Sequence, residues 1–404
     1  MISTYTTNFI GSDGVDLGSK LLTKERFNEY YLNIANQYIT PELWVWGNGN
    51  NGMLGRNNEI GSDIPVTTFV GGANWKQVSC SIDYAFAIKT DGTLWGWGTN
   101  DLTQLGINVT GNRSTPVTTF AGGNNWKQIS CGFEHNAAIK TDGTLWVWGI
   151  GTEGRLGTND QTSRSTPVTT FAGGNNWKQV SCGNAHTAAV KTDGTLWVWG
   201  ENSYGGIGDN TTAFKLTPVS TFLGGNDWKQ VSSGFQSTAA IKTDGTLWSW
   251  GDNSRGQLGN NTTTDSLTPV TTFIGGNNWK QVSCGLQYTA AIKTDGTLWT
   301  WGDNNRGCLG TNGAQNSVRT PITTFAGGNN WKQVSLPPDG SLSSAIKTDG
   351  TLWLWGGNVI NYGQLGNNTT TDSLTPVTTF AGGNNWKQVD VGALNAMAIR
   401  SYDD

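Results

Sequence analysis

Histidine is almost absent from this chain, because its 404 residues include only His135 and His186. Five cysteines occur, without a CxxC pair or a cysteine–histidine grouping at the spacing of zinc ligands. We therefore expect no metal site. Thiols without a pairing pattern are typical of a protein made in a reducing cytoplasm.

Charge is scarce too. Only 13% of residues are charged and the net charge is −4, whereas about a quarter of residues are charged in typical soluble domains. This composition lacks the excess of basic residues that is typical of proteins that bind nucleic acid or a membrane surface. No apolar run reaches the length of a membrane span. The start, residues 1–7, lacks the basic and apolar parts of a secretory signal.

Motifs of known enzymes are missing as well. The sequence has no phosphate-binding loop, no nucleophile elbow and no recurring close pair of carboxylates. We therefore expect no catalytic residues and no cofactor. An enzyme with its site at a central axis is the least favoured of three function classes.

Tryptophan, by contrast, is abundant and strictly periodic. A Leu-Trp-x-Trp-Gly motif occurs seven times, six copies at a spacing of 51 residues and the last after 54, with its first tryptophan at Trp44, Trp95, Trp146, Trp197, Trp248, Trp299 and Trp353. A second motif, Asn-Trp-Lys-Gln or a close variant, has its tryptophan at Trp75, Trp126, Trp177, Trp228, Trp279, Trp331 and Trp386. Three tryptophans in each of seven repeats account for all 21.

Each repeat predicts four short strands, as at 177–182, 187–191, 196–199 and 166–171. The turn Asp193-Gly194 between two apolar runs predicts a hairpin with a type I′ turn. Four antiparallel strands in each of seven units predict an all-β, seven-bladed propeller. A linear solenoid is the alternative, but it would need polar capping repeats at its ends.

The termini favour the closed ring. The first Leu-Trp-Val-Trp, at 43–46, has no preceding hairpin partner, and a strand without a partner lies at 391–400. We expect residues 43–47 to pair with 391–400, so that one blade contains both ends of the propeller. The predicted domains are a segment at 1–40 and a propeller at 41–404.

These repeats resemble those of the regulator of chromosome condensation family. The resemblance rests on Ser181–Val190, on Trp199-Gly200, and on Gly256-Gln-Leu-Gly259 followed by Pro269-Val270. It covers about residues 41–400 and implies a seven-bladed propeller. The family uses this scaffold for nucleotide exchange, enzyme regulation, adhesion and other tasks, so the resemblance does not select one function.

Residues 1–40 stand outside the repeat. We expect 1–18 to be extended and about 24–37 to form an amphipathic helix, with Phe27, Tyr31 and Ile34 as anchor residues. The helix would either pack on the propeller rim or dock the propeller onto a larger assembly. The leader Phe9–Lys24 resembles the openings of structural proteins in marine tailed phages.

The loops between Trp-Gly and the next Pro-Val differ among repeats, whereas the strands hardly vary. Loops 201–217 and 357–375 contain the large aromatics Tyr204, Phe214 and Tyr362, which are candidate contacts for a glycan or a protein, although single exposed aromatics are common. The seventh repeat has a two-residue insertion, 335–342, with two prolines. We expect it to bulge outward, either as a contact wedge or as a tolerated insertion.

Repeat positions also explain the scarce reactive residues. The two histidines share a position that holds leucine in another repeat, and four cysteines share one that also holds serine, leucine or valine. Neither position suits catalysis, so both are interpreted as structural. A lysine stands just before each Asp-Gly turn, as Lys191 does before Asp193-Gly194. We interpret these lysines and aspartates as turn chemistry, because exposed ion pairs contribute only about 0–1 kcal/mol.

The preferred interpretation is a non-enzymatic binding or structural module located in a phage virion as a tail, fibre or capsid-surface protein. Residues 1–40 would contact other virion or scaffold proteins, and the loops would contact a host-surface glycan or protein. This interpretation is compatible with an oligomer within the assembly. We expect neither binding to nucleic acid nor a membrane span. The alternative is a cytoplasmic interaction scaffold or a guanine nucleotide exchange factor of the chromosome condensation regulator type.

Overall fold

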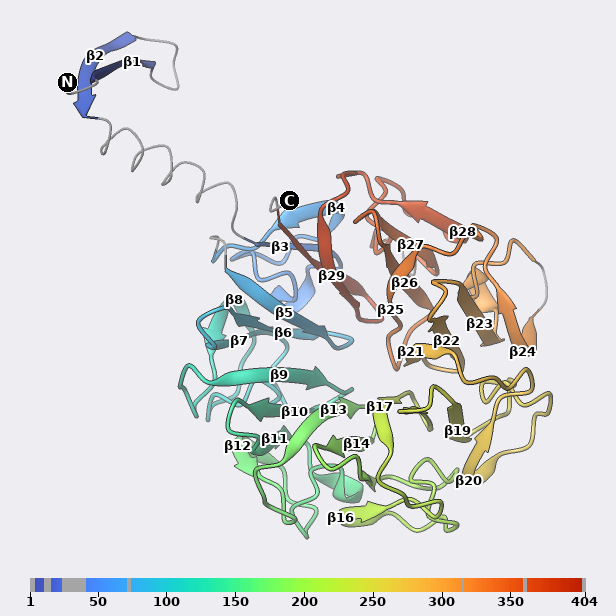
Figure 1. Cartoon of the computed structure of the whole chain (residues 1–404). Coiled ribbons are helices and arrows are strands. Elements are labelled where there is room, and N and C mark those ends of the chain that lie inside the picture. Colours follow the sequence, from blue (N-terminus) through green and yellow to red (C-terminus); the bar gives the residue numbers. More distant parts are fainter. Residues whose placement is uncertain are drawn as a thin grey trace.

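The computed structural model describes residues 4–10, 16–23, 41–70, 74–313, 316–358 and 362–401. Seven four-stranded antiparallel sheets stand around one central axis (Figure 1). A separate two-stranded sheet pairs β1 (Thr4–Ile10) with β2 (Asp16–Thr23). The all-β, seven-bladed prediction is therefore confirmed. The expected helix at 24–37, with Phe27, Tyr31 and Ile34, lies outside the described residues.

The strands of each blade follow one another from the axis outward. The innermost strands are β5 (Trp75–Cys80), β9 (Trp126–Cys131), β13 (Trp177–Cys182), β17 (Trp228–Ser233), β21 (Trp279–Cys284), β25 (Trp331–Ser335) and β29 (Trp386–Val391). The second strands are β6 (Tyr84–Lys89), β10 (His135–Lys140), β14 (His186–Lys191), β18 (Ser237–Lys242), β22 (Tyr288–Lys293), β26 (Leu342–Lys347) and β30 (Asn395–Arg400).

The third strands are β7 (Leu94–Gly98), β11 (Leu145–Gly149), β15 (Leu196–Gly200), β19 (Leu247–Gly251), β23 (Leu298–Asp303), β27 (Leu352–Gly356) and β3 (Glu42–Gly47). The outermost strands are β8 (Arg113–Thr118), β12 (Arg164–Thr169), β16 (Lys215–Ser220), β20 (Ser266–Thr271), β24 (Ser317–Thr323), β28 (Ser373–Thr378) and β4 (Ser62–Thr67). Short 3₁₀ turns η1 (Asn50–Gly52), η2 (Thr152–Gly154) and η3 (Asn305–Gly307) lie in three of the loops.

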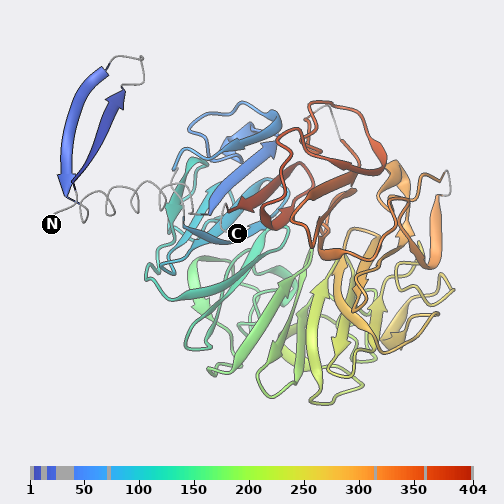
Figure 2. The same ribbon diagram turned by 45° about the horizontal axis from the view of Figure 1, so that its top comes forward.

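The ring closes as the sequence predicts. Strand β30 lies between β29 and β3, with Leu43 opposite Ile399 and Gly47 opposite Asn395. One blade thus combines the first strands of the propeller, drawn in lighter blue, with its last strands, drawn in red (Figure 2). Closure leaves no open blade at this seam.

The hairpin turn differs from the predicted type. A type I′ turn needs positive φ at both central residues, but Gly194 has a φ of 83° and Asp193 is not among the positive-φ residues. The Gly194 N–H donates to the Lys191 carbonyl, and the Lys191 N–H donates to the Thr195 carbonyl. The loop is therefore a three-residue turn with a left-handed glycine, which also suits the right-handed strand twist.

Tryptophans fill the space between blades. Trp199 is fully buried, and its Nε1 donates to the Arg155 carbonyl of the preceding blade's loop at 3.0 Å. A Cβ at Gly157 would lie 2.7 Å from that Nε1, and Gly157 has a φ of 65°. The last glycine of the Gly-x-Leu-Gly motif therefore allows the loop to lie against the tryptophan of the next blade, and Leu156 of the same motif packs in the core.

Candidate functional site

The strand directions give the propeller two different faces. Each innermost strand runs from the face that carries the Lys-Thr-Asp-Gly turns, here called the turn face, to the opposite end. That opposite end, the loop face, carries the variable loops such as 201–214 and the short loops such as 183–185. All the sequence variation noted above therefore lies on the loop face, as expected.

An axial channel runs inward from the turn face. On the turn-face side it forms a vestibule of about 230 Å³, lined by one glutamine from each innermost strand: Gln77, Gln128, Gln179, Gln230, Gln281, Gln333 and Gln388. Each amide also ties two blades together. For example, Gln179 Nε2 donates to the Val231 carbonyl at 2.7 Å, and the Val231 N–H donates to Gln179 Oε1 at 2.8 Å.

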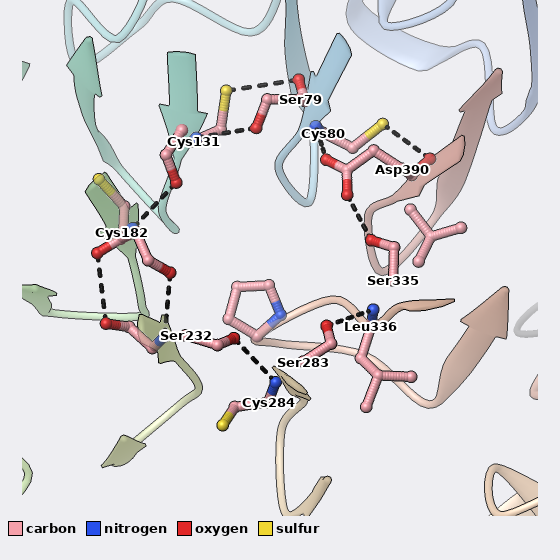
Figure 3. A pocket seen from close by; sticks show the side chains of 15 residues that line it. Ser79, Cys80, Cys131, Cys182, Ser232, Ser283, Cys284, Ser335, Leu336 and Asp390 are labelled. Atoms are coloured by element: carbon pink, nitrogen blue, oxygen red, sulfur yellow. Dashed lines mark hydrogen bonds between the residues drawn. The ribbon is translucent and has the colours of Figure 1, made fainter. Parts of the chain in front are cut away.

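A second ring lies deeper in the channel, beside a chamber of about 120 Å³ (Figure 3). Six blades contribute a serine whose position is shared: Ser79, Ser130, Ser181, Ser232, Ser283 and Ser335. In five of them the hydroxyl oxygen accepts the N–H of the residue at the end of the next blade's inner strand or just beyond it, as Ser79 Oγ does from Cys131 at 3.0 Å. The seventh blade has Asp390 in this position.

Asp390 is the one carboxylate that lines the channel within the described residues. Its Oδ2 accepts the Cys80 N–H at 2.8 Å, and its Oδ1 accepts the Ser335 hydroxyl. Burial raises the pKa of this carboxyl to about 6, although both hydrogen bonds oppose the rise. The sequence analysis missed Asp390. The signal was the single aspartate at a position where the other six repeats read Lys-Gln-Val-Ser or, once, Lys-Gln-Ile-Ser.

The insertion in the seventh repeat does not bulge outward, so that expectation was wrong. Leu336, Pro337 and Pro338 are buried, and Pro338 lines the axial chamber. Prolines need no ladder partner for a backbone N–H, so the chain can cross the end of the channel here. Both carboxyl oxygens of the next residue, Asp339, are buried without a partner in the described structure, and burial raises the pKa of Asp339 to about 7.

The histidines join neighbouring blades rather than form a reactive site. His135 Nε2 lies 2.9 Å from Thr187 Oγ1, and His186 Nε2 lies 2.9 Å from Thr238 Oγ1. Burial lowers the pKa of His186 to about 4, so this ring is neutral at pH 7. All five cysteines are free and buried. Within the described residues, no group of three or more His, Cys, Asp or Glu residues could hold a metal ion.

The turn lysines have a different role from the one expected. Asp193 Oδ1 accepts the N–H and hydroxyl of Thr195, at 3.0 and 2.7 Å. Lys191 Nζ instead lies over two rings, 4.6 Å from the Trp177 centroid and 4.8 Å from that of Trp197. The same arrangement occurs in every blade, with Arg400 in the closing one. Each cation therefore covers a tryptophan pair at the turn face.

Removing one of these contacts should measurably destabilise the ring. We expect Lys191→Ala to lower the free energy of unfolding by about 1–2 kcal/mol, because the cation lies over two aromatic faces. The matched control is Lys178→Ala in the same blade, whose exposed side chain should matter by less than about 0.5 kcal/mol. Thermal unfolding of both variants tests this, and equal melting temperatures would contradict the proposed contact.

The predicted contact residues lie on the loop face but do not form one cluster. Tyr204 and Phe214 are 41% and 46% exposed and share the loop between β15 and β16. Tyr362 is half-buried in the loop between β27 and β28, three blades away. A binding role for the three residues stays a prediction.

A second set of aromatics went unnoticed in the sequence. One phenylalanine per blade follows the outermost strand, and its side chain is 61–68% exposed: Phe69, Phe120, Phe171, Phe222, Phe273, Phe325 and Phe380. The backbone there is fixed, because the Phe171 N–H donates to the Gly157 carbonyl at 2.9 Å. The signal was the sevenfold Thr-Thr-Phe, or Ser-Thr-Phe, that follows each Pro-Val or Pro-Ile.

The charges of the propeller are divided between its faces. Between residues 41 and 401 the loop face carries fourteen acidic and eight basic residues, whereas the turn face carries fourteen basic and eight acidic residues. One lysine per innermost strand is exposed at the turn face, a set named here the lysine ring: Lys76, Lys127, Lys178, Lys229, Lys280, Lys332 and Lys387. The small net charge of the chain conceals this division.

Comparisons with known proteins agree with this architecture. Residues 123–403 match the RCC1-like domain, and residues 42–88 and 91–139 match the regulator of chromosome condensation (RCC1) repeat. The chain is 34% identical over 284 residues to the ultraviolet-B receptor UVR8 of Arabidopsis thaliana, covering 69% of this chain and 64% of UVR8. It is 30% identical over 353 residues to human E3 ubiquitin-protein ligase HERC2, covering 84% of this chain and 7% of HERC2.

Solved structures show the same fold. Human WBSCR16 aligns with a TM-score of 0.78 at 20% identity, over 90% of this chain and all of that structure. Yeast RCC1 (Prp20), solved bound to Kap60, aligns with a TM-score of 0.77 at 18% identity, over 92% of each chain. The chain thus spans less than two thirds of the curated relatives UVR8 and HERC2, but nearly all of the RCC1-type structures.

These matches correct the functional prediction. The virion-associated phage protein, its tail or host-attachment role and its location in a virion were wrong, because the matched proteins are cellular proteins of plants, animals and yeast. The phage likeness rested on a polar leader of some 25 residues without chemistry of its own, whereas the family matches span the whole ring. Among the described residues, no helix is long and apolar enough to cross a bilayer. By the match of most of its length, the chain belongs to the regulator of chromosome condensation (RCC1) repeat family.

Proposed function

We propose that this propeller is a non-enzymatic protein-binding module, and that its loop face holds a partner with a basic segment. One observation carries the proposal: the variable loops and an excess of six acidic residues, fourteen against eight, occupy the same face of a nearly invariant scaffold. Opposite charges on two surfaces steer association and suppress unsuitable partners. The five buried free cysteines fit a protein that works in a reducing compartment such as the cytoplasm.

Ion pairs neutralise only part of the acidic side chains of this face. Within the described residues, five of the fourteen have a basic side chain within 4.0 Å: Glu134, Glu153, Asp160, Asp209 and Asp372. Arg155 has two carboxylates near it, Glu153 at 3.2 Å and Glu134 at 3.6 Å. One buried carboxyl oxygen of Asp83 and both of Asp339 have no hydrogen-bond partner in the described structure. Burial raises the pKa of both groups. Nearby carboxylates add to the rise, Glu134 and Asp101 for Asp83, and Asp83 for Asp339. A cationic partner would relieve this repulsion.

The exposed aromatics Tyr204 and Phe214 would add apolar contact on the same face. Exposed tyrosine and phenylalanine bury large areas on binding with few rotatable bonds to immobilise. Prp20p, a yeast protein with this fold, was solved in a study of its binding to Gsp1p and histones. Basic histones and a Gsp1p-type protein are therefore the two probes to test first, the second also for guanine nucleotide exchange.

A loop exchange tests the proposal. Loop 201–214 would be replaced by the sequence of 252–265, which has the same length and stands in the same place one blade on. The fold should survive, because the flanking strands are nearly the same, and binding of the probe protein should weaken at least about tenfold. The matched control replaces 252–265 by 201–214. Unchanged binding in the first variant, measured by calorimetry, would contradict a role for this loop.

A further inference from the structure

We propose that the lysine ring on the turn face is a binding site for a compact, multiply phosphorylated ligand seated over the mouth of the axial channel. This site lies on the opposite face from the proposed protein-binding loops. It rests on different residues, so either proposal can fail alone.

The backbone places each lysine at the rim of the channel. Strand β13 pairs with β14 through a bulge between Trp177 and Gln179, so that Lys178 is the extra residue. A bulge leaves its extra residue outside the ladder and redirects the side chain. Gln179 lines the vestibule, and Lys178, one residue nearer the turn face, is exposed. The same register shift occurs beside the corresponding lysine in every blade. In the blade of β9 and β10 it falls between Ile139 and Lys140 of the second strand, opposite the same place.

The ring has a fixed geometry. The glutamine clamps hold each innermost strand to the next, as in the pair formed by Gln128 and Val180. Lysines of adjacent blades therefore stand in the same register around the mouth. Across the seam, Lys76 and Lys387 line one hollow together with Trp75 and Pro41, which shows that neighbouring ring members share a surface.

Six of the seven ring lysines form no ion pair with a carboxylate in the described part of the chain. Within the described residues, the ion pairs with distances of 4.0 Å or less include none with Lys76, Lys127, Lys178, Lys229, Lys280 or Lys332. The turn aspartates stand further out, between the second and third strands, where they bind threonine. Asp227, the acidic residue in a blade connection, pairs with Lys242 at 3.2 Å.

The ring also limits the kind of ligand. A ring of equivalent amines can select a ligand by its charge and size, but it cannot recognise a particular nucleotide or peptide sequence. An ammonium group binds phosphate as a point charge. Only a compact anion over the axis can approach many of them at once. Asp390, deeper in the channel, opposes entry of an anion, so the ligand would rest on the rim. A myo-inositol polyphosphate or a short polyphosphate has this chemistry.

The test uses the full chain and inositol hexakisphosphate as the probe, with calorimetric titration at low and high salt. We expect measurable binding that weakens as salt rises. The ring variant carries four substitutions, and affinity should fall by about 30-fold or more, which is about 2 kcal/mol. A matched control removes four charges from the loop face and should bind like the unaltered protein. The ring variant is Lys127→Gln, Lys178→Gln, Lys229→Gln and Lys280→Gln, and the control is Arg56→Gln, Arg113→Gln, Arg255→Gln and Arg319→Gln.

Three results would overturn the proposal. The first is no binding of the probe by the unaltered protein at low salt. The second is an equal loss in both variants, which would mean that net charge alone attracts the anion. The third is tighter binding of a DNA oligonucleotide, or of vesicles with anionic lipid, than of the compact probe. Six of the eight side chains are exposed, whereas Arg56 and Arg113 are half-buried. Matching thermal melts of the two variants are therefore required to show that folding is not the cause.

Discussion

A chain that ends at residue 394 should fail to form the propeller. This truncation removes β30, which lies between β29 and β3 and joins the two ends of the ring through a backbone ladder on each side. Met397 and Ile399 are 1% and 2% exposed in the core shared with the next blade, and Ala396 and Ala398 enter the core on the other side. Burial of each large side chain contributes about 1.5–3 kcal/mol. Both flanking strands would become open edges.

Tryptophan fluorescence, near-ultraviolet circular dichroism and gel filtration would detect the loss of packing. A chain that ends at residue 401 is the first control, because it keeps β30 whole. The second is a circular permutant that joins residue 400 to residue 42 by a short turn and opens in the exposed loop near Asn159. It should fold, because it converts the closing blade into an ordinary one. A truncated chain that melted cooperatively within a few degrees of the full length would contradict this account of closure.

The fold was predictable because the repeat supplies the same information seven times. One hairpin signal is ambiguous, but seven with one spacing predict a ring, and the blade without a hairpin predicts where it closes. The turn type was not predictable from Asp193-Gly194 alone. The observed turn has three residues, and it is accompanied by hydrogen bonds from Thr195 to Asp193, which the two turn residues alone do not reveal.

The binding surfaces were harder to predict, because they depend on which residues different blades bring together. Lys191 stacks on Trp177 and Trp197, contacts that a reading of the neighbouring Asp193 could not reveal. Net charge hid the division between the faces, since opposite excesses cancel in the sum. Tyr362 was grouped with Tyr204 by residue type, yet three blades separate them.

Asp390→Ser should stabilise the protein at neutral pH. The substitution restores the residue that six other blades have in this ring, and the new hydroxyl can accept the Cys80 N–H as Ser79 accepts that of Cys131. It also removes a buried carboxylate. The folded pKa of about 6 against the ordinary 3.8 corresponds to a penalty on the order of 3 kcal/mol for the ionised form. The melting temperature should therefore rise by several degrees.

The pH dependence of this gain follows from the direction of the shift. Between about pH 4 and 6 the folded protein holds a proton on Asp390 that the unfolded chain has released, so the penalty is complete above pH 6 and disappears as the pH falls towards 3.8. His186, with its pKa lowered to about 4, acts in the opposite sense, because the unfolded chain takes up its proton first as the pH falls below 6.5. That contribution is common to both proteins and cancels in their difference. The stability gained by Asp390→Ser should thus be largest at pH 7–8 and close to zero at pH 4. The reverse change at another blade, Ser181→Asp, places a carboxylate in the same ring and should lower the free energy of unfolding at pH 7–8 by a similar amount. A gain that stayed constant over this range, measured by melts at each pH, would show that burial of the charge is not the cause.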